Sequence, residues 1–229
     1  MSSRTAGVVL ARSLSVVDDV ALWSQVPPPF RGPARYFHAV TIGQRRALGM
    51  PSQALADERF RERLYAVLAA WGMSSRAAEL SDYSELFRRA QALRDEIDVL
   101  ASESLGALEQ PAAVADTLWG LITRLRVSDT RSQLVAGSKF LHHLLPNLVP
   151  PMDRAYTGAF FCKHDLNSQT LVLQSRQDQW WRAMFCEFSR FAKQRREVIA
   201  PLIDGDWQTG VPKVIDNAIV GWVSTQKSR

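Results

Sequence analysis

The sequence has few cysteines and no long apolar run. Its two cysteines, Cys162 and Cys186, are too far apart for a CxxC redox or zinc motif, and both stand among aromatic residues, so we expect buried, reduced thiols. The only apolar run near the start, residues 8–11, is too short for the core of a secretory signal peptide. No stretch approaches the ~20 apolar residues of a membrane-spanning helix. These absences predict a soluble, cytoplasmic protein that makes no contact with a membrane.

Lysine is absent from the first 138 residues. Residues 1–130 contain 15 Arg and 15 acidic residues and are therefore neutral, whereas residues 131–229 contain 13 Lys or Arg against 8 acids. The entire excess of +5 thus lies in the C-terminal part. A basic face of this kind can attract a phosphate backbone, but the same charge is also ordinary for a soluble protein. Both interpretations stay open.

The sequence does contain repeated helical patterns, punctuated by proline and glycine. Apolar residues recur at steps of three and four, and Pro33 and Pro111 precede or open such segments. An aromatic stripe from Trp181 to Phe191 follows helical spacing and is therefore expected to be core. The expected helices cover residues 14–25, 34–48, 53–71, 83–102, 112–125, 131–135, 138–145, 154–161, 178–199 and 212–223. The only candidate strand, residues 170–173, is too short to support a sheet.

These patterns predict an all-α fold. We expect a single helical domain over residues 1–229, with an N-terminal helical part of about 1–130 and a hairpin with a C-terminal helical part of about 131–229. No repeat or long linker divides the chain. The oligomeric state is not encoded in any pattern that we can identify.

Residues 134–154 carry the strongest functional pattern. Gly137 is expected to form a tight turn between two helices, with Ser138 as the cap of the helix that Lys139 begins. A turn leading into a helix N-terminus offers unpaired N–H groups that attract anions such as phosphate. This arrangement would place the Lys139 amine beside a bound anion.

A rigid loop follows this segment and ends at an acidic residue. Pro150 and Pro151 fix the approach to Asp153, whose carboxylate can cap the next helix or face Lys139 across a cleft. A lysine and a carboxylate held in this way can form a covalent-catalysis pair, in which the amine attacks a carbon and the acid moves protons. Lys139 and Asp153 are therefore the candidate catalytic residues.

At these residues the chain resembles a known family. Gly137-Ser138-Lys139, followed by Pro151-Met152-Asp153, is similar to the core of the helix-hairpin-helix DNA glycosylases, although only one glycine of the family's Leu-Pro-Gly-x-Gly-x-Lys string is present. In that family the hairpin binds the DNA backbone, a lysine at this position attacks the sugar of a flipped-out nucleotide in bifunctional members, and a downstream aspartate is essential. The longer string is also similar to bacterial proteins to which no activity is assigned.

The resemblance implies a helix-hairpin-helix element, DNA as the partner and base excision as the activity. It assigns Lys139 and Asp153 to catalysis. Contacts to nucleic acid would come from the hairpin and from basic residues near helix ends: Gly137, Ser138, Arg154, Lys193, Arg195 and Arg196. Four further residues of one expected helix could neutralise phosphates: Arg35, His38, Arg45 and Arg46.

Structural interpretations compete with each of these assignments. Lys139 can be a solvated lysine, Asp153 only an N-cap and Gly137 only a turn residue, which would leave a non-catalytic helical binding or scaffold protein. His142 and His143 are adjacent and face different sides of a helix, so they do not chelate one metal easily. The acidic residues near Trp207, which are Asp204, Asp206 and Asp216, fit a loop more simply than a metal site. We therefore expect no metal and no cofactor.

Overall fold

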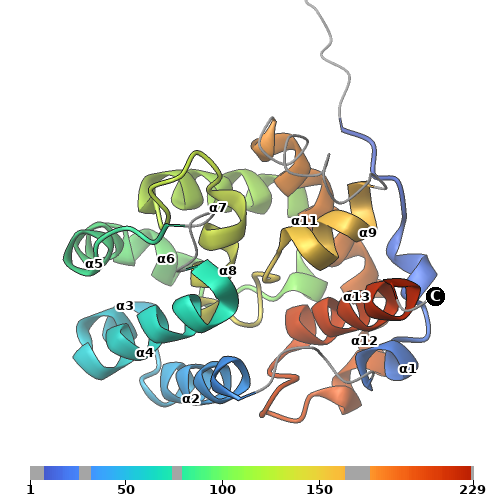
Figure 1. The fold of residues 1–229 in the computed structure, drawn as a ribbon, viewed down its shortest axis with the longest axis horizontal. Helices are drawn as coiled ribbons and strands as arrows, with labels where there is room; N and C mark the ends of the chain where they lie inside the picture. Colours follow the sequence, from blue (N-terminus) through green and yellow to red (C-terminus); the bar gives the residue numbers. More distant parts are fainter. Residues whose placement is uncertain (1–7, 26–31, 74–78, 163–175, 228–229) are drawn as a thin grey trace, which may run out of the picture.

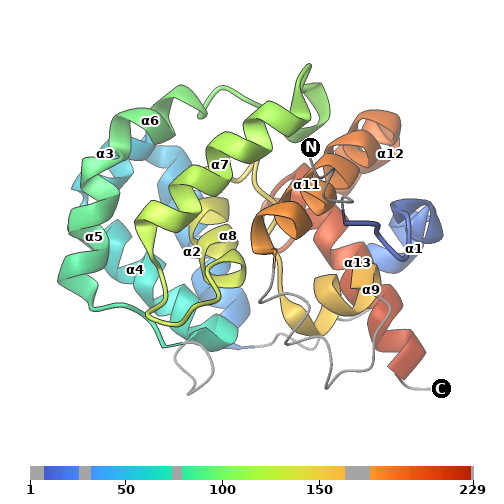
Figure 2. The same cartoon turned by 90° about the horizontal axis from the view of Figure 1, so that it is seen from above.

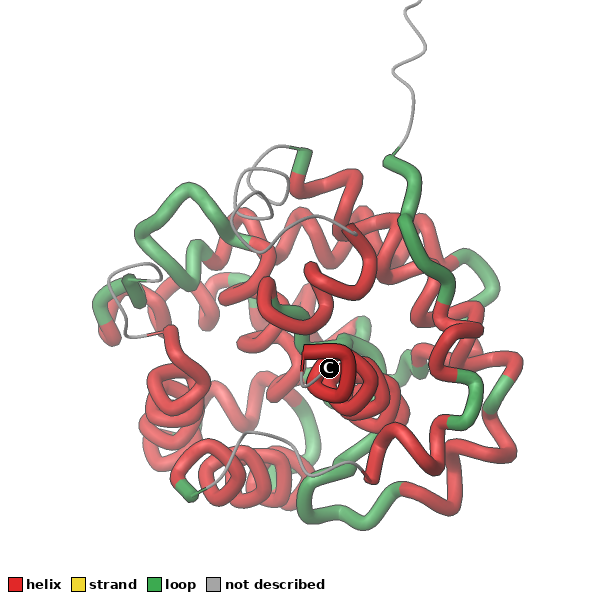
Figure 3. Tube along the Cα trace, turned by 45° about the vertical axis from the view of Figure 1, so that its right-hand side comes forward, coloured by secondary structure: helices red, strands yellow, loops and turns green. Residues whose placement is uncertain are grey.

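The computed structural model describes residues 8–25, 32–73, 79–162 and 176–227. Every regular element in these ranges is a helix, as Figure 3 shows, and their one isolated antiparallel bridge joins Leu80 and Ser128. The all-α prediction is confirmed for this part of the chain, while the candidate strand at residues 170–173 lies outside it. None of the described helices is both long and apolar enough to cross a membrane.

The helices form two neighbouring groups in Figures 1 and 2. In the first group α2 packs against α4 and α8, α3 against α5 and α6, and α7 against α8. Its members are α2 (Pro33–Ala47), α3 (Pro51–Ala56), α4 (Glu58–Leu68), η2 (Ala69–Met73), α5 (Tyr83–Ala92), α6 (Arg94–Val99), α7 (Pro111–Leu125) and α8 (Leu134–Leu144).

The second group contains both ends of the described chain. Helix α1 packs against α13, and α11 packs along α7 and so joins the two groups (Figure 2). The Ala11 N–H donates to the Phe161 carbonyl at 2.7 Å, which ties the N-terminal segment to the C-terminal helices. The members are η1 (Leu14–Val17), α1 (Val20–Gln25), η4 (Arg154–Gly158), α9 (Ala159–Cys162), α11 (Gln177–Gln194), α12 (Arg196–Ile199), η5 (Ala200–Leu202) and α13 (Val211–Lys227); the short η3 (Leu105–Ala107) contacts α11 and α13.

One hydrophobic cluster runs through both groups. The aromatic stripe of α11 is part of it, since Trp181, Phe185 and Phe188 are buried, and Trp181 Nε1–H donates to the Ala115 carbonyl at 2.8 Å. The prediction that this stripe is core is therefore confirmed. Both cysteines are free thiols, and burial raises the pKa of Cys162 to about 11.

Helix boundaries follow the proline and aspartate residues more closely than they follow the hydrophobic period. Pro33 and Pro111 open α2 and α7 as expected. Two long expected helices are each split, the first at Asp57, whose carboxylate accepts the Phe60 N–H at 2.7 Å and starts α4, and the second at Leu93. An aspartate side chain that competes for backbone N–H groups ends one helix and caps the next, which a hydrophobic period alone does not reveal.

The expected glycine turn at Gly137 is wrong. Helix α8 runs without a break through Gly137, Ser138 and Lys139, and the Gly137 N–H donates to the Gln133 carbonyl at 2.8 Å as in any helix interior. Glycine is required here by packing, because a Cβ atom would lie 2.6 Å from Cγ2 of Ile122 on α7. The hairpin predicted at this glycine is therefore not formed, and the residue instead allows α7 and α8 to approach closely.

Ser138 also has a different role from the predicted helix cap. Its hydroxyl donates to the Val135 carbonyl at 3.0 Å and accepts the Met152 N–H at 3.1 Å. The second bond ties the loop that follows α8 back onto the helix. This contact fixes the end of the loop one residue before Asp153.

Candidate functional site

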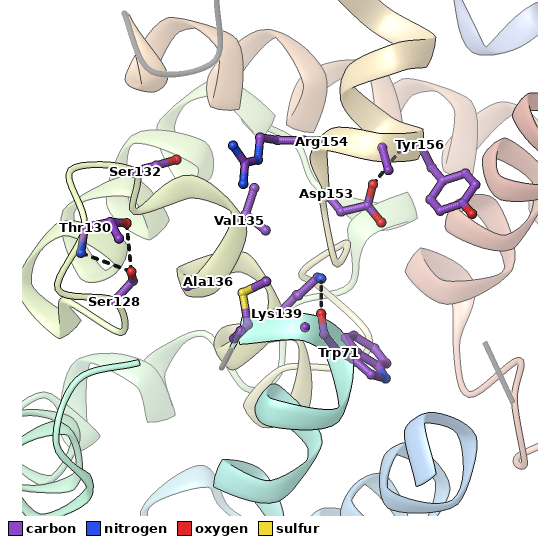
Figure 4. Close-up of a pocket in the computed structure, with 13 residues that line it drawn as sticks. Trp71, Ser128, Thr130, Ser132, Val135, Ala136, Lys139, Asp153, Arg154 and Tyr156 are labelled. Atoms are coloured by element: carbon purple, nitrogen blue, oxygen red, sulfur yellow. Dashed lines mark hydrogen bonds between the residues drawn. The ribbon is translucent and has the colours of Figure 1, made fainter. Parts of the chain in front are cut away.

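A cavity of about 230 Å³ lies where four segments of the chain meet (Figure 4). Its walls come from residues 71–73 of η2, residues 128–136, Lys139 on α8 and residues 153–156 at the start of η4. Lys139 and Asp153 thus line the same hollow, which agrees with the expectation that Asp153 can face Lys139 across a cleft. The cavity brings together groups that are far apart in the sequence.

Lys139 is buried at the inner wall of this cavity rather than solvated. Only 7% of its surface is exposed, and its Nζ donates to the Trp71 carbonyl oxygen at 3.1 Å. Burial lowers the pKa of Lys139; Asp153 and Asp216 oppose that shift, whereas Lys213 and Arg154 reinforce it. A lysine with a lowered pKa is neutral more often at a given pH, and the neutral amine is the nucleophilic form.

Asp153 caps η4, which confirms the N-cap prediction. Its Oδ1 accepts the Tyr156 N–H at 2.7 Å, and its own N–H donates to Thr157 Oγ1 at 3.2 Å. Among the described residues no salt bridge joins the Asp153 carboxylate to Lys139, although Asp153 is the charged group that acts most strongly on the Lys139 amine. The carboxylate is therefore positioned by the backbone of η4 rather than by the lysine.

A buried ion pair lies behind Lys139, beside a small hollow of about 20 Å³. Lys213 Nζ donates to Asp216 Oδ2 at 2.6 Å and to Asn217 Oδ1 at 2.7 Å, and lies 4.1 Å from the ring centre of Trp207. Burial raises the pKa of Asp216, and the neighbouring Lys213 partly opposes this shift.

The role of Lys213 was missed by the sequence reasoning. The available signal was the spacing of Lys213, Asp216 and Asn217 at i, i+3 and i+4 on one expected helix, which places their side chains on one face. In the sequence, Asp216 stands out only as a member of the acidic cluster near Trp207. In the structure Asp204 instead accepts the backbone N–H groups of residues 206–208, and Asp206 forms an ion pair with Arg35.

Three buried histidines lie beside the cavity and contact one another through their rings, and two of them, His38 and His143, are joined by a hydrogen bond. His143 Nδ1 lies 2.8 Å from the Lys139 carbonyl, so it must donate, and His143 Nε2 then accepts from His38 Nδ1 at 3.1 Å. His38 Nε2 accepts from the Thr209 hydroxyl at 3.0 Å. His142 Nδ1 donates to the Val149 carbonyl at 2.7 Å. These bonds fix one neutral tautomer for each ring.

Burial keeps the three histidine rings uncharged. Desolvation lowers the pKa of His38 and His142 well below the ordinary value, and it lowers the pKa of His143 to about 4. His38 is therefore not the phosphate contact that the sequence suggested. In the part of the chain that the structure describes, no group of three or more His, Cys, Asp or Glu residues is arranged to hold a metal ion.

The other predicted nucleic-acid contacts are scattered. Gly137 and Ser138 are buried and have no surface to offer DNA. Arg154 lines the cavity, whereas Lys193 and Arg196 are exposed at the junction of α11 and α12, away from the cavity walls. Arg195 beside them forms an ion pair with Asp18.

The basic residues of α2 are also engaged within the protein. Arg45 is buried and its Nε–H donates to the Leu144 carbonyl at 2.8 Å, while Arg46 donates to the Thr209 carbonyl. With Arg35 paired to Asp206, this helix presents no free basic face of the predicted kind. These arginines fasten α2 to its neighbours.

The site combines a buried amine, a carboxylate and an aromatic wall around an open hollow. An amine of lowered pKa can attack an electrophilic carbon, and a nearby carboxylate can move the protons or stabilise a developing positive charge. No protein-family model, curated protein or solved structure matches this chain. What the site does must therefore be inferred from its own geometry.

Proposed function

We propose that the protein binds DNA and excises a base from it, with a flipped-out nucleotide entering the cavity beside Lys139. The single observation that carries this proposal is that the Lys139 amine, whose pKa is lowered by burial, shares one cavity with the Asp153 carboxylate. The absence of the Gly137 hairpin means that DNA must be held by other surfaces. Chemistry on a base requires its extrusion from the stacked duplex, so a cavity of this kind is a prerequisite.

The reaction would proceed through attack at the sugar carbon C1′. The neutral Lys139 amine forms a bond to C1′ while the bond from C1′ to the base breaks and the base leaves with the electron pair. The departing base takes a proton from solvent, and the alkylated amine loses one of its protons. The nitrogen lone pair then forms the C=N bond while the bond from C1′ to the ring oxygen O4′ breaks, and O4′ takes a proton, which leaves a protonated imine on the opened sugar. The Asp153 carboxylate would stabilise the positive charge on the sugar ring and accept protons from the amine.

The size of the cavity supports a small occupant. About 230 Å³ is below the roughly 300–1,000 Å³ of pockets that hold drug-sized ligands, and it suits a single sugar or base. Trp71 lines both hollows and already stacks on His38, with ring centres 5.1 Å apart. A tryptophan wall offers a stacking surface for a base of any identity.

Borohydride trapping tests the proposal directly. Oligonucleotides that carry an abasic site or a panel of damaged bases should give a covalent adduct with the native protein after reduction of the imine. Lys139→Met should abolish the adduct, and Lys193→Met, which removes an exposed lysine far from the cavity, should leave it unchanged. The absence of any adduct across the panel would overturn the proposal.

A non-catalytic binding role is favoured by one observation. The Lys139 amine already donates to the Trp71 carbonyl, so it can serve to hold η2 against α8. In that case DNA affinity would fall steeply with increasing salt, without any adduct or turnover. The trapping experiment separates the two roles because only the enzyme forms a reducible intermediate.

A further inference from the structure

Two polar side chains at the cavity have no partner among the residues that the structure describes. Arg154 and Ser132 both line the cavity and are half-buried, and neither makes a hydrogen bond or an ion pair with any residue that the structure describes. Figure 4 shows the Ser132 hydroxyl pointing toward the Arg154 guanidinium from the opposite wall. A half-buried guanidinium that makes no hydrogen bond lowers the stability of the folded protein unless a ligand or water accepts its hydrogen bonds.

Neighbouring groups make this end of the cavity suited to an anion. The hydroxyls of Ser128 and Thr130 lie 2.8 Å apart on the same wall as Ser132, and either one can donate to an incoming oxygen. Arg154 supplies the positive charge at this end of the cavity, because the proposed reaction uses Lys139 in its neutral form. A planar guanidinium binds two oxygens of one phosphate in parallel.

We infer that Arg154, together with the Ser132 and Thr130 hydroxyls, binds a phosphate group of the ligand whose sugar faces Lys139. The inference rests on the proposed function for the position of the sugar, and the phosphate contact itself depends only on these side chains. The phosphate can belong to a DNA backbone or to a free sugar phosphate, since both present the same oxygens. Arg154 is then a binding residue that sets the distance between the phosphate and the reacting carbon.

Two small aldehydes test the inference. Deoxyribose 5-phosphate and deoxyribose carry the same reactive carbon, and only the first carries a phosphate. With cyanoborohydride present, the native protein should be modified at least about tenfold faster by the phosphorylated sugar, as loss of one charge-assisted hydrogen bond implies. Arg154→Met should remove that preference, so that this variant reacts with the two sugars at equal rates. Equal rates for the two sugars with the native protein would overturn the inference.

Arg196→Met is the matched control, because Arg196 is exposed and distant from the cavity walls, and it should keep the preference. A parallel arm with an abasic oligonucleotide separates the two sources of phosphate. A larger effect of Arg154→Met on the oligonucleotide than on the free sugar phosphate assigns the contact to the DNA backbone, and the reverse assigns it to a phosphate monoester.

A binding measurement keeps this inference independent of the proposed chemistry. Lys139→Met cannot form an imine, so calorimetric titration of this variant with deoxyribose 5-phosphate reports the phosphate contact alone. Binding that disappears in the variant that also carries Arg154→Met supports the inference even if no adduct is ever trapped. Absence of binding to Lys139→Met, or equal binding by the two variants, contradicts it.

Discussion

Asp153 has two separable roles at the scale of a single residue. Its Oδ1 caps η4, and its charge acts on Lys139. Asparagine also caps helices, so Asp153→Asn should keep the stability of the native protein while slowing adduct formation by roughly a hundredfold or more, the usual range for a lost acid or base. Asp153→Ala should slow it equally and also lose about 1 kcal/mol of stability. Equal trapping rates for the native protein and Asp153→Asn would remove the carboxylate from the mechanism.

Gly137 gives a prediction about packing at the same scale. Gly137→Ala places a Cβ 2.6 Å from Ile122 Cγ2, and such overpacking should destabilise the protein by roughly 1–3 kcal/mol in urea unfolding. Gly120→Ala on α7 is the matched control, because nothing lies within 4 Å of its added Cβ, and it should stabilise by roughly 0.5–1 kcal/mol. A harmless Gly137→Ala would contradict the close approach of α7 and α8.

Single residues also show what the sequence can and cannot predict. The cap at Asp153 was predictable because it depends on an aspartate three residues before the N–H that it accepts. The role of Gly137 was not predictable, because its cause is Ile122 on a different helix. The sequence around a glycine looks the same whether the glycine forms a turn or allows two helices to pack closely. Only the position of the neighbouring helix distinguishes the two cases.

At the scale of elements, helix ends set by proline were predicted and the split helices were not. The start of α13 was predicted to within one residue, its end was placed four residues too early, and its buried face was not recognised as ionic. Lys213 and Asp216 point into the protein beside Lys139, where a hydrophobic-moment argument expects apolar side chains. Polar groups at core positions mark places where function can override the pattern.

Lys213→Met tests this buried ionic pair of α13. Removing one partner of a buried pair typically costs about 3–5 kcal/mol, because the other charge is left in a low-dielectric site. Burial already raises the pKa of Asp216, so in Lys213→Met this carboxyl can take up a proton as the pH falls. The destabilisation relative to the native protein should therefore be larger at pH 8 than at pH 5 in urea unfolding. A pH-independent difference would count against an ionised pair.

At the scale of the whole molecule, the buried histidines couple stability to pH. In the unfolded chain they take up protons below about pH 6.5, whereas in the folded protein they stay neutral until a lower pH, which is about 4 for His143. The unfolded state therefore binds more protons in this window, and stability falls as the pH decreases from 6.5 towards 4. The loss should approach about 1.4 kcal/mol per pH unit for each histidine.

Urea unfolding at pH 7.5, 6.5 and 5.5 checks this dependence above the range in which most carboxylates titrate. A free energy of unfolding that stays constant between pH 6.5 and 5.5 would show that the rings are accessible to protons in the folded protein. The effect could not be foreseen from the sequence, because His38 joins His142 and His143 only through the packing of α2 against α8.

The arrangement of the two helix groups was likewise beyond sequence reasoning. The pairing of α1 with α13 joins opposite ends of the chain, and the cavity walls come from segments that no spacing rule connects. What the sequence did indicate was the pair of residues, Lys139 and Asp153, that this packing brings to one hollow. Their local context was misjudged, since Lys139 lies in mid-helix and is buried.

We propose that the Lys139 amine is the nucleophile of this cavity, and peptide mapping of the reduced adduct identifies the amine that reacts. The protein is treated with an abasic oligonucleotide and borohydride, the DNA is digested, and the modified peptide is sequenced by mass spectrometry. We expect the modified peptide to carry the adduct on Lys139. An adduct on an exposed amine such as Lys193, or no modified peptide at all, would contradict it.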